Sequence, residues 1–320
     1  MSTSSSRQKL VLAGRLIKHT LRGQKLRHLT VEVTKRCNAK CSFCDYWKEP
    51  PQEELADYGP IVRHFNPLVV TLSGGEPLLR DDLEEVVAGI RRADPHVYLG
   101  MVTNAALLDV KRARGLHRAG LNQLFISLDY NDEKHGRVRA LPGLYGRITA
   151  LLPELREVGF HSVGFNTVIK DDNLDSIPGI LDLAVSHGVQ VGFSSYCELK
   201  TGNPGPMVSE RNSLKLAEVI SLIKACKRKH SVTRTSDYYL DRVEDYFSAN
   251  EILGCRAGQS WVQVTPAGEI KPCSELPVAE KDYRGYAPSE AKPVSCTACW
   301  YSCRGESQAP LTLGRVRELL

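Results

Sequence analysis

The sequence contains no long apolar run. None of its hydrophobic stretches approaches the roughly 18 residues that a membrane-spanning helix needs. The opening MSTSSSRQKL does not lead into the apolar core of a secretory signal, and internal repeats are lacking. These absences predict a globular cytoplasmic protein. In that compartment thiols stay reduced, so ten cysteines favour metal binding or catalysis over disulfides.

Acidic side chains are missing from residues 1–31, which carry seven lysines and arginines, whereas the chain as a whole has a net charge of +5. We interpret residues 1–28 as a basic amphipathic helix, with leucines on one half and cations opposite. This pattern allows three interpretations. Residues 7–28 could contact the inner membrane surface peripherally, the helix could present phosphate-binding side chains, or it could pack on the main domain with its basic face in solvent. Nucleic-acid binding is not expected, since no other basic cluster or aromatic stacking pattern accompanies it.

Short runs rich in β-branched residues alternate with helical patterns from residue 29 onward. The predicted strands are 29–34, 68–73, 97–103, 123–128, 162–169 and 189–194. The predicted helices are 53–65, 81–93, 109–119, 147–158, 176–187 and 213–229. This alternation requires right-handed crossovers, so it predicts an α/β fold with a parallel sheet and chemistry at the carboxyl ends of its strands. Periodicity leaves a doubly wound sheet and a barrel or partial barrel as alternatives.

The pattern gives way to Gly, Pro and Cys after about residue 250. This segment has too few apolar residues for a core of its own, so we expect it to be stapled by a metal. The sequence therefore predicts a main domain over residues 29–235 and a small cysteine-rich domain over residues 236–320.

The most specific motif is RCNAKCSFCDYW, residues 36–47, which holds Cys37, Cys41 and Cys44. It follows the first predicted strand directly. Three thiolates suit a soft metal or an iron-sulfur cluster, and on a four-iron cube they leave one iron for an external ligand. The alternative is a zinc site completed by a distant His or Cys.

This motif resembles the Cys-x3-Cys-x-aromatic-Cys of radical S-adenosylmethionine (SAM) enzymes, with Phe43 as the aromatic residue. The resemblance implies a partial (β/α)6 TIM-like barrel, which agrees with the six strand-helix units. It also implies a SAM-binding 4Fe-4S cluster, SAM itself and an electron donor such as flavodoxin or ferredoxin. In that family SAM is cleaved to a 5'-deoxyadenosyl radical, which abstracts hydrogen from an unactivated carbon.

A second match is SGGEP, which follows the second strand and contains Gly74, Gly75 and Glu76. It resembles the family's Gly-Gly-Glu motif, whose role is to receive the amino group of SAM. Glycines allow the backbone to approach a ligand closely, and a carboxylate accepts hydrogen bonds from an ammonium group. Taken alone, the same residues are also found in ordinary turns.

Polar residues end three further strands, at positions where the resemblance implies contacts to SAM. They are Thr103 and Asn104 in TNA, Ser127 and Asp129 in ISLD, and Asn166 in FNTVIK. Ala105 departs from the Thr-Asn-Gly of many relatives, and its backbone is less free than that of glycine. Each could be a hydrogen-bonded residue at a strand end, but their repetition beside the cysteines favours the cofactor.

The C-terminal region carries five more cysteines, and it resembles the opening of the SPASM and Twitch auxiliary-cluster domains. They are Cys255, Cys273, Cys296, Cys299 and Cys303. Five cysteines are too few for a complete SPASM domain, so the resemblance implies one auxiliary 4Fe-4S cluster. We assign Cys255, Cys273 and Cys296 first, with Cys299 and Cys303 as alternatives for the last ligand. A zinc knuckle would use the same spacing.

Cys197 in SSYCE follows the sixth strand, at the rim that faces the predicted cofactor. A thiol in this position could give hydrogen to a substrate radical, as such a residue does in radical epimerases of this family. The alternative is a small, partly buried hydrophobic residue.

The sequence therefore predicts a radical SAM enzyme that acts on a nonpeptide small molecule. The basic N-terminal segment favours a lipid or isoprenoid substrate, and the single auxiliary cluster favours a sugar or aminocyclitol. A peptide-modifying SPASM maturase is a weaker alternative. Only 28 residues precede the first strand, which is too few for the winged-helix peptide-recognition domain such enzymes often carry. A noncatalytic iron-sulfur or zinc protein at a membrane surface is the remaining alternative.

Overall fold

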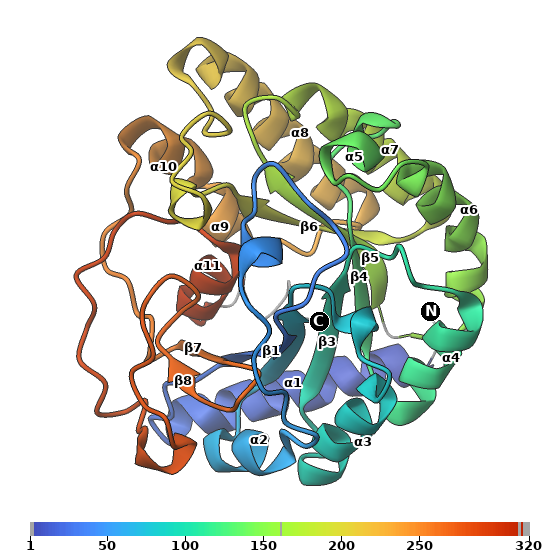
Figure 1. Ribbon diagram of the computed structural model, residues 1–320. Coiled ribbons are helices and arrows are strands. Elements are labelled where there is room, and N and C mark those ends of the chain that lie inside the picture. The colour runs from blue at the N-terminus through green and yellow to red at the C-terminus, as the bar shows by residue number, and fades with distance from the viewer. Residues whose placement is uncertain (1–2, 161, 313–314, 316–320) are drawn as a thin grey trace.

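The computed structural model describes residues 3–160, 162–312 and 315, without the side chains of residues 3–9 (Figure 1). Its centre is an open sheet with strand order β6-β5-β4-β3-β2-β1-β7-β8. The strands are β1 (His28–Thr34), β2 (Val69–Gly74), β3 (Tyr98–Thr103), β4 (Gln123–Ser127), β5 (Ser162–Ile169), β6 (Gln190–Ser195), β7 (Trp261–Val264) and β8 (Ile270–Lys271).

All six predicted strands are present, and each end lies within one residue of the prediction. Strands β1 to β6 pair in parallel with their sequence neighbours, as the alternation of strands and helices requires. The sheet curves without closing, and β6 and β8 form its two edges. The prediction of an α/β fold with a partial TIM-like barrel is confirmed.

Helices cover the outer face of the curved sheet (Figure 1). The α-helices of the described residues are α1 (Thr3–Leu21), α2 (Gly59–Phe65), α3 (Leu83–Ala93), α4 (Val110–Ala119), α5 (Lys134–Val138), α6 (Leu144–Glu157), α7 (Ile177–His187), α8 (Ser213–His230), α9 (Asp237–Leu240), α10 (Val243–Ala249) and α11 (Ser302–Gln308), of which α1 and α11 lie apart from the outer layer. The prediction of a helix over residues 53–65 is wrong in its first half. Pro60 lies in the first turn of α2, and the preceding chain is held by the Leu55 amide, which donates to the Pro266 carbonyl at 2.9 Å.

Alternation along the strands separates an apolar outer face from a polar inner one. In β1, Leu29, Val31 and Val33 are fully buried in the core between sheet and helices. Thr30 and Glu32 point the other way, into a cavity enclosed by the curved sheet. We call this cavity the lumen. A lumen that presents polar side chains among apolar ones suits a ligand that carries polar groups.

The C-terminal segment extends the same sheet. β7 pairs in parallel with β1, and β8 pairs with β7 in the antiparallel sense. Val262, Val264 and Trp300 belong to the main hydrophobic core. The segment therefore does not depend on metal alone for burial, because it shares the core of the barrel. The predicted boundary between residues 235 and 236 stays a prediction.

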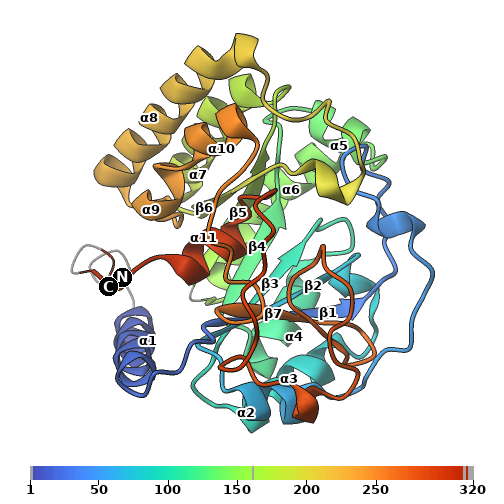
Figure 2. The same cartoon turned by 90° about the vertical axis from the view of Figure 1, so that its left-hand side faces the viewer.

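Helix α1 lies across the amino-terminal ends of the first strands, apart from the helices that line the outer face (Figure 2). Arg15 forms an ion pair with Asp94 at 2.8 Å and donates to the Pro67 carbonyl, while Leu16 and His19 are buried. The helix therefore packs on the main domain, as one of the alternatives had it, but its basic face is not wholly in solvent, because Arg15 of that face is engaged by the main domain. The side chains of Arg7 and Lys9, two of the seven cations of the N-terminal segment, lie outside the described part.

Among the helices in the described ranges, none combines the length and apolar character needed to cross a membrane.

Candidate active site

The cysteine motif forms a loop that begins where β1 ends. Cys41 and Phe43 are buried in a small apolar cluster with Tyr196, and Cys37 and Cys44 pack against its edge, half-buried. The loop is anchored to the far side of the barrel, because the Lys40 amide donates to the Arg139 carbonyl at 2.9 Å and the Ser42 amide to the Val138 carbonyl. The three thiols thus lie at the carboxyl ends of the strands, as predicted.

The two glycines of SGGEP fit β2 against the start of this loop. The Gly75 amide donates to the Thr34 carbonyl at 2.9 Å, and the Glu76 amide donates to the Arg36 carbonyl at 2.8 Å. A Cβ on Gly74 would lie 2.2 Å from the Thr34 oxygen, and one on Gly75 would lie 2.1 Å from the Arg36 oxygen. The glycines therefore allow close approach to the protein's own backbone, which fixes the position of the cysteine loop.

Glu76 is buried at the centre of a hydrogen-bond network. Its carboxylate accepts from the Thr103 hydroxyl at 2.6 Å, the Asn104 amide at 2.7 Å and the Leu78 amide at 3.0 Å. Burial raises the pKa of Glu76, and these hydrogen bonds oppose the rise. The Asn104 side chain in turn donates to Asn38 in the cysteine loop at 2.7 Å. SGGEP and TNA are therefore connected to each other and to the cysteine motif.

Ala105 occupies the left-handed region of backbone space, with φ of +64°. Its amide donates to the Thr103 hydroxyl at 2.9 Å, which holds the turn after β3. Glycine adopts this conformation freely, whereas alanine there is strained by about 1–2 kcal/mol. The departure from Thr-Asn-Gly therefore leaves the turn intact and strains one residue.

Asp129 is fully buried after β4, and its carboxylate is engaged by protein groups. Oδ2 accepts from the Arg139 guanidinium at 2.5 Å, and Oδ1 accepts from the Val168 amide at 2.9 Å. Burial alone would raise the pKa of Asp129, but the charges of Lys170 and Arg139 outweigh it and lower the pKa to about 2. The neighbouring Ser127 ends β4 and pairs with Asn166 of β5.

Two cations beside Cys41 were not predicted from the sequence. Arg139 donates to the Cys41 sulfur at 3.7 Å, and the Lys170 ammonium lies 4.0 Å from the centre of the Phe43 ring. Within the described residues, the buried Lys170 Nζ and Arg139 Nε have no hydrogen-bond partner. Lys170 ends the segment FNTVIK, and its place directly after a strand could have marked it as a site residue in the sequence. Arg139 lies in a loop, where no sequence pattern marks it.

The three thiols are held in their neutral form. Burial raises the pKa of Cys37 to about 11, and the pKa values of Cys41 and Cys44 are raised in the same way. Bound metal would displace these protons, and the nearby cations favour an anionic thiolate cluster. In residues 3–160, 162–312 and 315, no three His, Cys, Asp or Glu side chains are gathered tightly enough for a single metal ion. Cysteine donors flanked by cations fit an iron-sulfur cluster.

The lumen has a volume of about 440 Å³ and touches both cysteine groups. Four of the predicted site residues are among those that line it: Cys44, Gly74, Asn166 and Cys303. Thr71 and Ser73 of β2 and Gln123 of β4 add further polar groups. A ligand in the lumen would therefore lie between the N-terminal and the C-terminal cysteines.

Lys200 and Glu275 form a second group that the sequence did not indicate. Lys200 Nζ lies 2.7 Å from Glu275 Oε1, which also accepts from the Tyr301 hydroxyl at 3.1 Å. The same ammonium lies 4.7 Å from the centre of the Tyr46 ring, and the Tyr46 hydroxyl donates to Glu32. Because the partners are widely separated in sequence, no local pattern could have paired them.

The C-terminal cysteines gather around Trp261. Cys255 is buried with Trp261, and Cys273 and Cys303 pack against the same cluster. Cys296 is half-buried, and it contributes to the raised pKa of Cys255. Burial raises the pKa of Cys303 to about 12, with a further contribution from Cys273.

Cys299 is buried within electrostatic reach of Cys303 and Cys197. Cys197 is itself buried, and its thiol donates to the Ala298 carbonyl at 3.1 Å. Burial raises the pKa of Cys197. The predicted hydrogen donor therefore contacts the C-terminal segment.

Comparison with known proteins agrees with this geometry. Residues 31–184 match the family model described as the Radical SAM superfamily. The chain is 28% identical over 266 residues to the PqqA peptide cyclase of Gluconobacter oxydans (strain 621H), covering 77% of this chain and 69% of that protein. It is 32% identical over 210 residues to the GTP 3',8-cyclase of Rhodococcus opacus (strain B4), covering 60% and 58% of the two chains.

Among solved structures, Streptococcus suis SuiB bound to S-adenosylmethionine matches with a TM-score of 0.66 at 17% identity. The match covers 85% of this chain and 67% of SuiB. At this identity the similarity concerns the fold. The chain spans about three fifths of the length of the GTP cyclase that it matches.

Proposed function

We propose, from the match of residues 31–184 to the Radical SAM superfamily model, that the chain is an enzyme that cleaves SAM reductively. Cys37, Cys41 and Cys44 would hold a 4Fe-4S cluster and leave one iron for SAM. When bound, the cluster and SAM supply a 5'-deoxyadenosyl radical for hydrogen abstraction from an unactivated carbon. The observation that carries the proposal is the connection of the cysteine loop to Glu76 and Asn104 through the Asn104–Asn38 hydrogen bond.

The surrounding residues position the cofactors. Glu76 is held rigidly by three donors, so its remaining lone pairs can accept from the amino group of SAM. Lys170 brings a buried positive charge whose hydrogen-bonding capacity is unused within the described residues, which suits an anionic group of the cluster or of SAM. Ser127, Asp129 and Asn166 remain candidates for the cofactor's hydroxyl groups, with Asn166 lining the lumen.

One auxiliary 4Fe-4S cluster is the second part of the proposal. Cys255, Cys273, Cys296 and Cys303 would be its ligands, because three of them pack on one cluster and Cys296 acts electrostatically on Cys255. We choose Cys303 over Cys299 as the last ligand, because Cys303 packs on the Trp261 cluster together with Cys255 and Cys273. A zinc site with the same four ligands is the alternative to this cluster, and measuring zinc and iron in the protein distinguishes the two.

A nonpeptide substrate in the lumen is the third part. The lumen presents serine, threonine and amide groups from successive strands, which suits a polar part of a small molecule. The GTP 3',8-cyclases among the relatives are named for a nonpeptide substrate, whereas the PqqA peptide cyclase supports the peptide-modifying alternative.

Anaerobic reconstitution with iron and sulfide, followed by iron counting and an assay for 5'-deoxyadenosine, tests the cofactor claims. With a low-potential donor such as flavodoxin or ferredoxin, we expect about eight irons per chain and formation of 5'-deoxyadenosine. Cys41→Ala should abolish the nucleoside product and retain about four irons. Product formed equally by Cys41→Ala would overturn the assignment of the loop.

Helix α1 supports a further proposal, peripheral contact with an anionic membrane through residues 7–28. Leu10 and Leu21 are 65% and 82% exposed, Ile17 is exposed on the same side, and Lys18 and Arg22 are exposed beside them. Exposed leucines next to cations are typical of an interfacial helix. The protein should sediment with phosphatidylglycerol vesicles, and Leu10→Ser with Leu21→Ser should release it. Equal sedimentation of the double variant would exclude this contact.

A further inference from the structure

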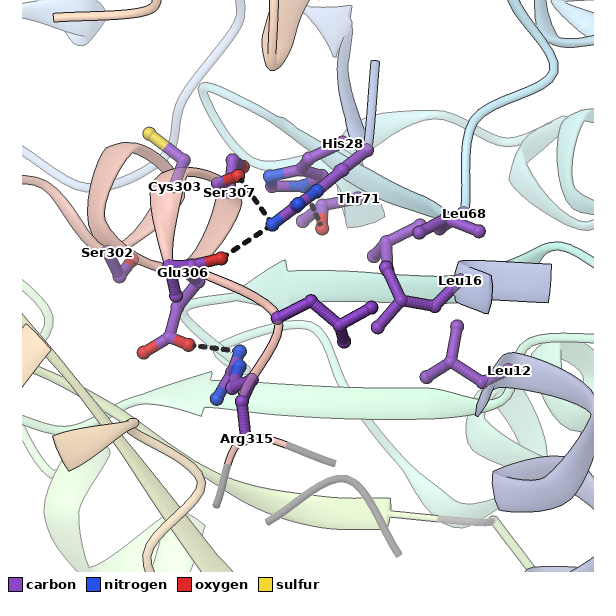
Figure 3. Close-up of a pocket in the computed structure, with 14 residues that line it drawn as sticks. Leu12, Leu16, His28, Leu68, Thr71, Ser302, Cys303, Glu306, Ser307 and Arg315 are labelled. Carbon is purple, nitrogen blue, oxygen red and sulfur yellow. Dashed lines mark hydrogen bonds and ion pairs between the residues drawn. The ribbon is translucent and has the colours of Figure 1, made fainter. Parts of the chain in front are cut away.

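An apolar pocket of about 210 Å³ lies beneath the barrel, between α1 and the end of α11 (Figure 3). Leu12 and Leu16 of α1 and Leu68 before β2 form one wall, as Figure 3 shows. Ala309 and Leu311, which follow α11, also line the pocket. We call this cavity the α1 pocket. Its lining differs from that of the lumen, which has more polar side chains, among them Thr30, Glu32 and Asn166.

The α1 pocket and the lumen share part of their walls. His28, Thr71, Ser302, Cys303 and Glu306 line both cavities. His28 and Thr71 come from neighbouring strands and are joined by a hydrogen bond of 2.9 Å (Figure 3). The two cavities therefore adjoin, with the polar one toward Cys44 and the apolar one toward α1.

The charged groups around the α1 pocket already have partners. Arg27 donates to the Ala309 carbonyl at 2.6 Å and to the Ser307 carbonyl, and Glu306 pairs with Arg315 at 2.6 Å. Burial lowers the pKa of His28 to about 4, so its imidazole is neutral near pH 7. An apolar group could enter this pocket without stripping water from an unpaired charge.

We propose that the α1 pocket binds an unbranched aliphatic chain whose polar end lies in the adjoining lumen. The inference rests on the proposed function and narrows it, because it makes the substrate amphipathic. Two observations select this occupant. The shared wall continues into the lumen, where a purely apolar ligand would leave polar side chains without partners. The leucine wall belongs to α1, whose opposite side carries exposed Leu10 and Leu21.

Binding of alkan-1-ols measures the pocket directly, without SAM chemistry. Hexan-1-ol, octan-1-ol and decan-1-ol would be titrated calorimetrically into the full-length reconstituted protein. Each added methylene should lower the dissociation constant about fourfold until the pocket is filled. Octane-1,8-diol should bind at least about tenfold more weakly than octan-1-ol, because its second hydroxyl would lie among leucines. An affinity that does not change with chain length would overturn the proposal, and so would a diol that binds as tightly as octan-1-ol.

Two substitutions on the same helix provide a matched pair. Leu12→Trp fills the pocket and should weaken decan-1-ol binding by about tenfold or more, while Leu10→Trp changes an exposed position and should leave it within about twofold. A melting curve shows whether Leu12→Trp detaches α1. In that case Ala309→Leu, which fills the pocket from the opposite side, replaces it as the test variant. Equal affinities in Leu12→Trp, Ala309→Leu and Leu10→Trp would refute the site.

Two further measurements separate this inference from its premise. If the preparation cleaves SAM but does not bind alkanols, the proposal for the α1 pocket is wrong and the proposed function stands. If it binds alkanols but does not cleave SAM, the pocket proposal stands and the proposed enzymatic function is wrong. A variant that ends at residue 315 tests the remaining occupant. If alkanols bind only after residues 316–320 are deleted, the pocket belongs to the chain's own end and the proposal is wrong.

Discussion

Lys200 Nζ lies 2.7 Å from Glu275 Oε1, and this ion pair joins the segment after β6 to the segment after β8. Lys200 borders the lumen, as Cys44 and Cys303 do, and it lies within electrostatic reach of both cysteines. Burial alone would lower the pKa of Lys200, but Tyr46 and Glu275 outweigh it and raise the pKa. The pair therefore stays ionised and connects the two cysteine groups.

Replacing Lys200 should destabilise the protein by leaving Glu275 without its partner. The two side chains are 22% and 12% exposed, so we expect Lys200→Met to lower the free energy of unfolding by about 1–3 kcal/mol. Urea denaturation measures this difference. Lys215 pairs with Asp175 at the surface, and Lys215→Met should stay within about 0.5 kcal/mol of the parent. Similar losses in both variants would contradict the buried role of Lys200.

Gly75 should tolerate no side chain. Gly75→Ala would place a Cβ 2.1 Å from the Arg36 carbonyl oxygen, so the cysteine loop must shift. We expect a loss of stability of several kcal/mol, on the order of 3, and reduced iron content after reconstitution. Gly14→Ala on α1 meets no atom within 4 Å and should be neutral or stabilising. A Gly75→Ala protein that binds iron normally would disprove this account of the glycines.

The depressed pKa of Asp129 predicts a pH dependence in acid. Because its folded pKa of about 2 lies below the unfolded value, Asp129 stabilises the fold above about pH 4, and this contribution is lost as pH falls toward 2. The stabilisation is about 2 kcal/mol. Asp129→Asn lacks this step, so its stability difference from the parent should shrink between pH 5 and pH 2 in urea titrations. Parallel pH curves would show that the ion pair with Arg139 is not formed.

Cys197 is the candidate hydrogen donor. We expect Cys197→Ala to leave 5'-deoxyadenosine formation within about twofold while product formation falls at least about tenfold. Cys197→Ser retains a donor to the Ala298 carbonyl but holds its hydrogen too strongly for transfer to a carbon radical, so it should resemble the alanine variant. Normal turnover by Cys197→Ser would show that Cys197 is not the hydrogen donor and that its thiol serves only for packing.

Much of the fold follows from local patterns in the sequence. The six strands were predictable because each is a short β-branched run whose outward residues, such as Val31 and Val70, are fully buried. Helix α2 was misplaced because residues 53–58 look helical yet are held by backbone contact with Pro266. β7 escaped prediction because four residues carry little periodicity, and its pairing with β1 is a long-range event.

The candidate site divides in the same way. Cys37, Cys41, Cys44 and Glu76 were predictable because the chemistry depends on residue types at short spacing. Arg139 and Lys200 were missed, since their roles arise from contacts with Asp129 and Glu275 that only folding creates. The glycines of SGGEP were found for an incomplete reason: close approach was expected to a ligand, and the approach observed is to the chain itself.

Electron paramagnetic resonance of the reduced, anaerobically reconstituted protein tests the central claim most directly. An auxiliary-site variant, Cys255→Ala with Cys273→Ala, would isolate the signal of the loop cluster. Addition of SAM should shift the g values of that signal, because SAM binds the iron that the three thiolates leave open. A spectrum that SAM does not change, or a preparation that contains zinc in place of iron, would contradict the account.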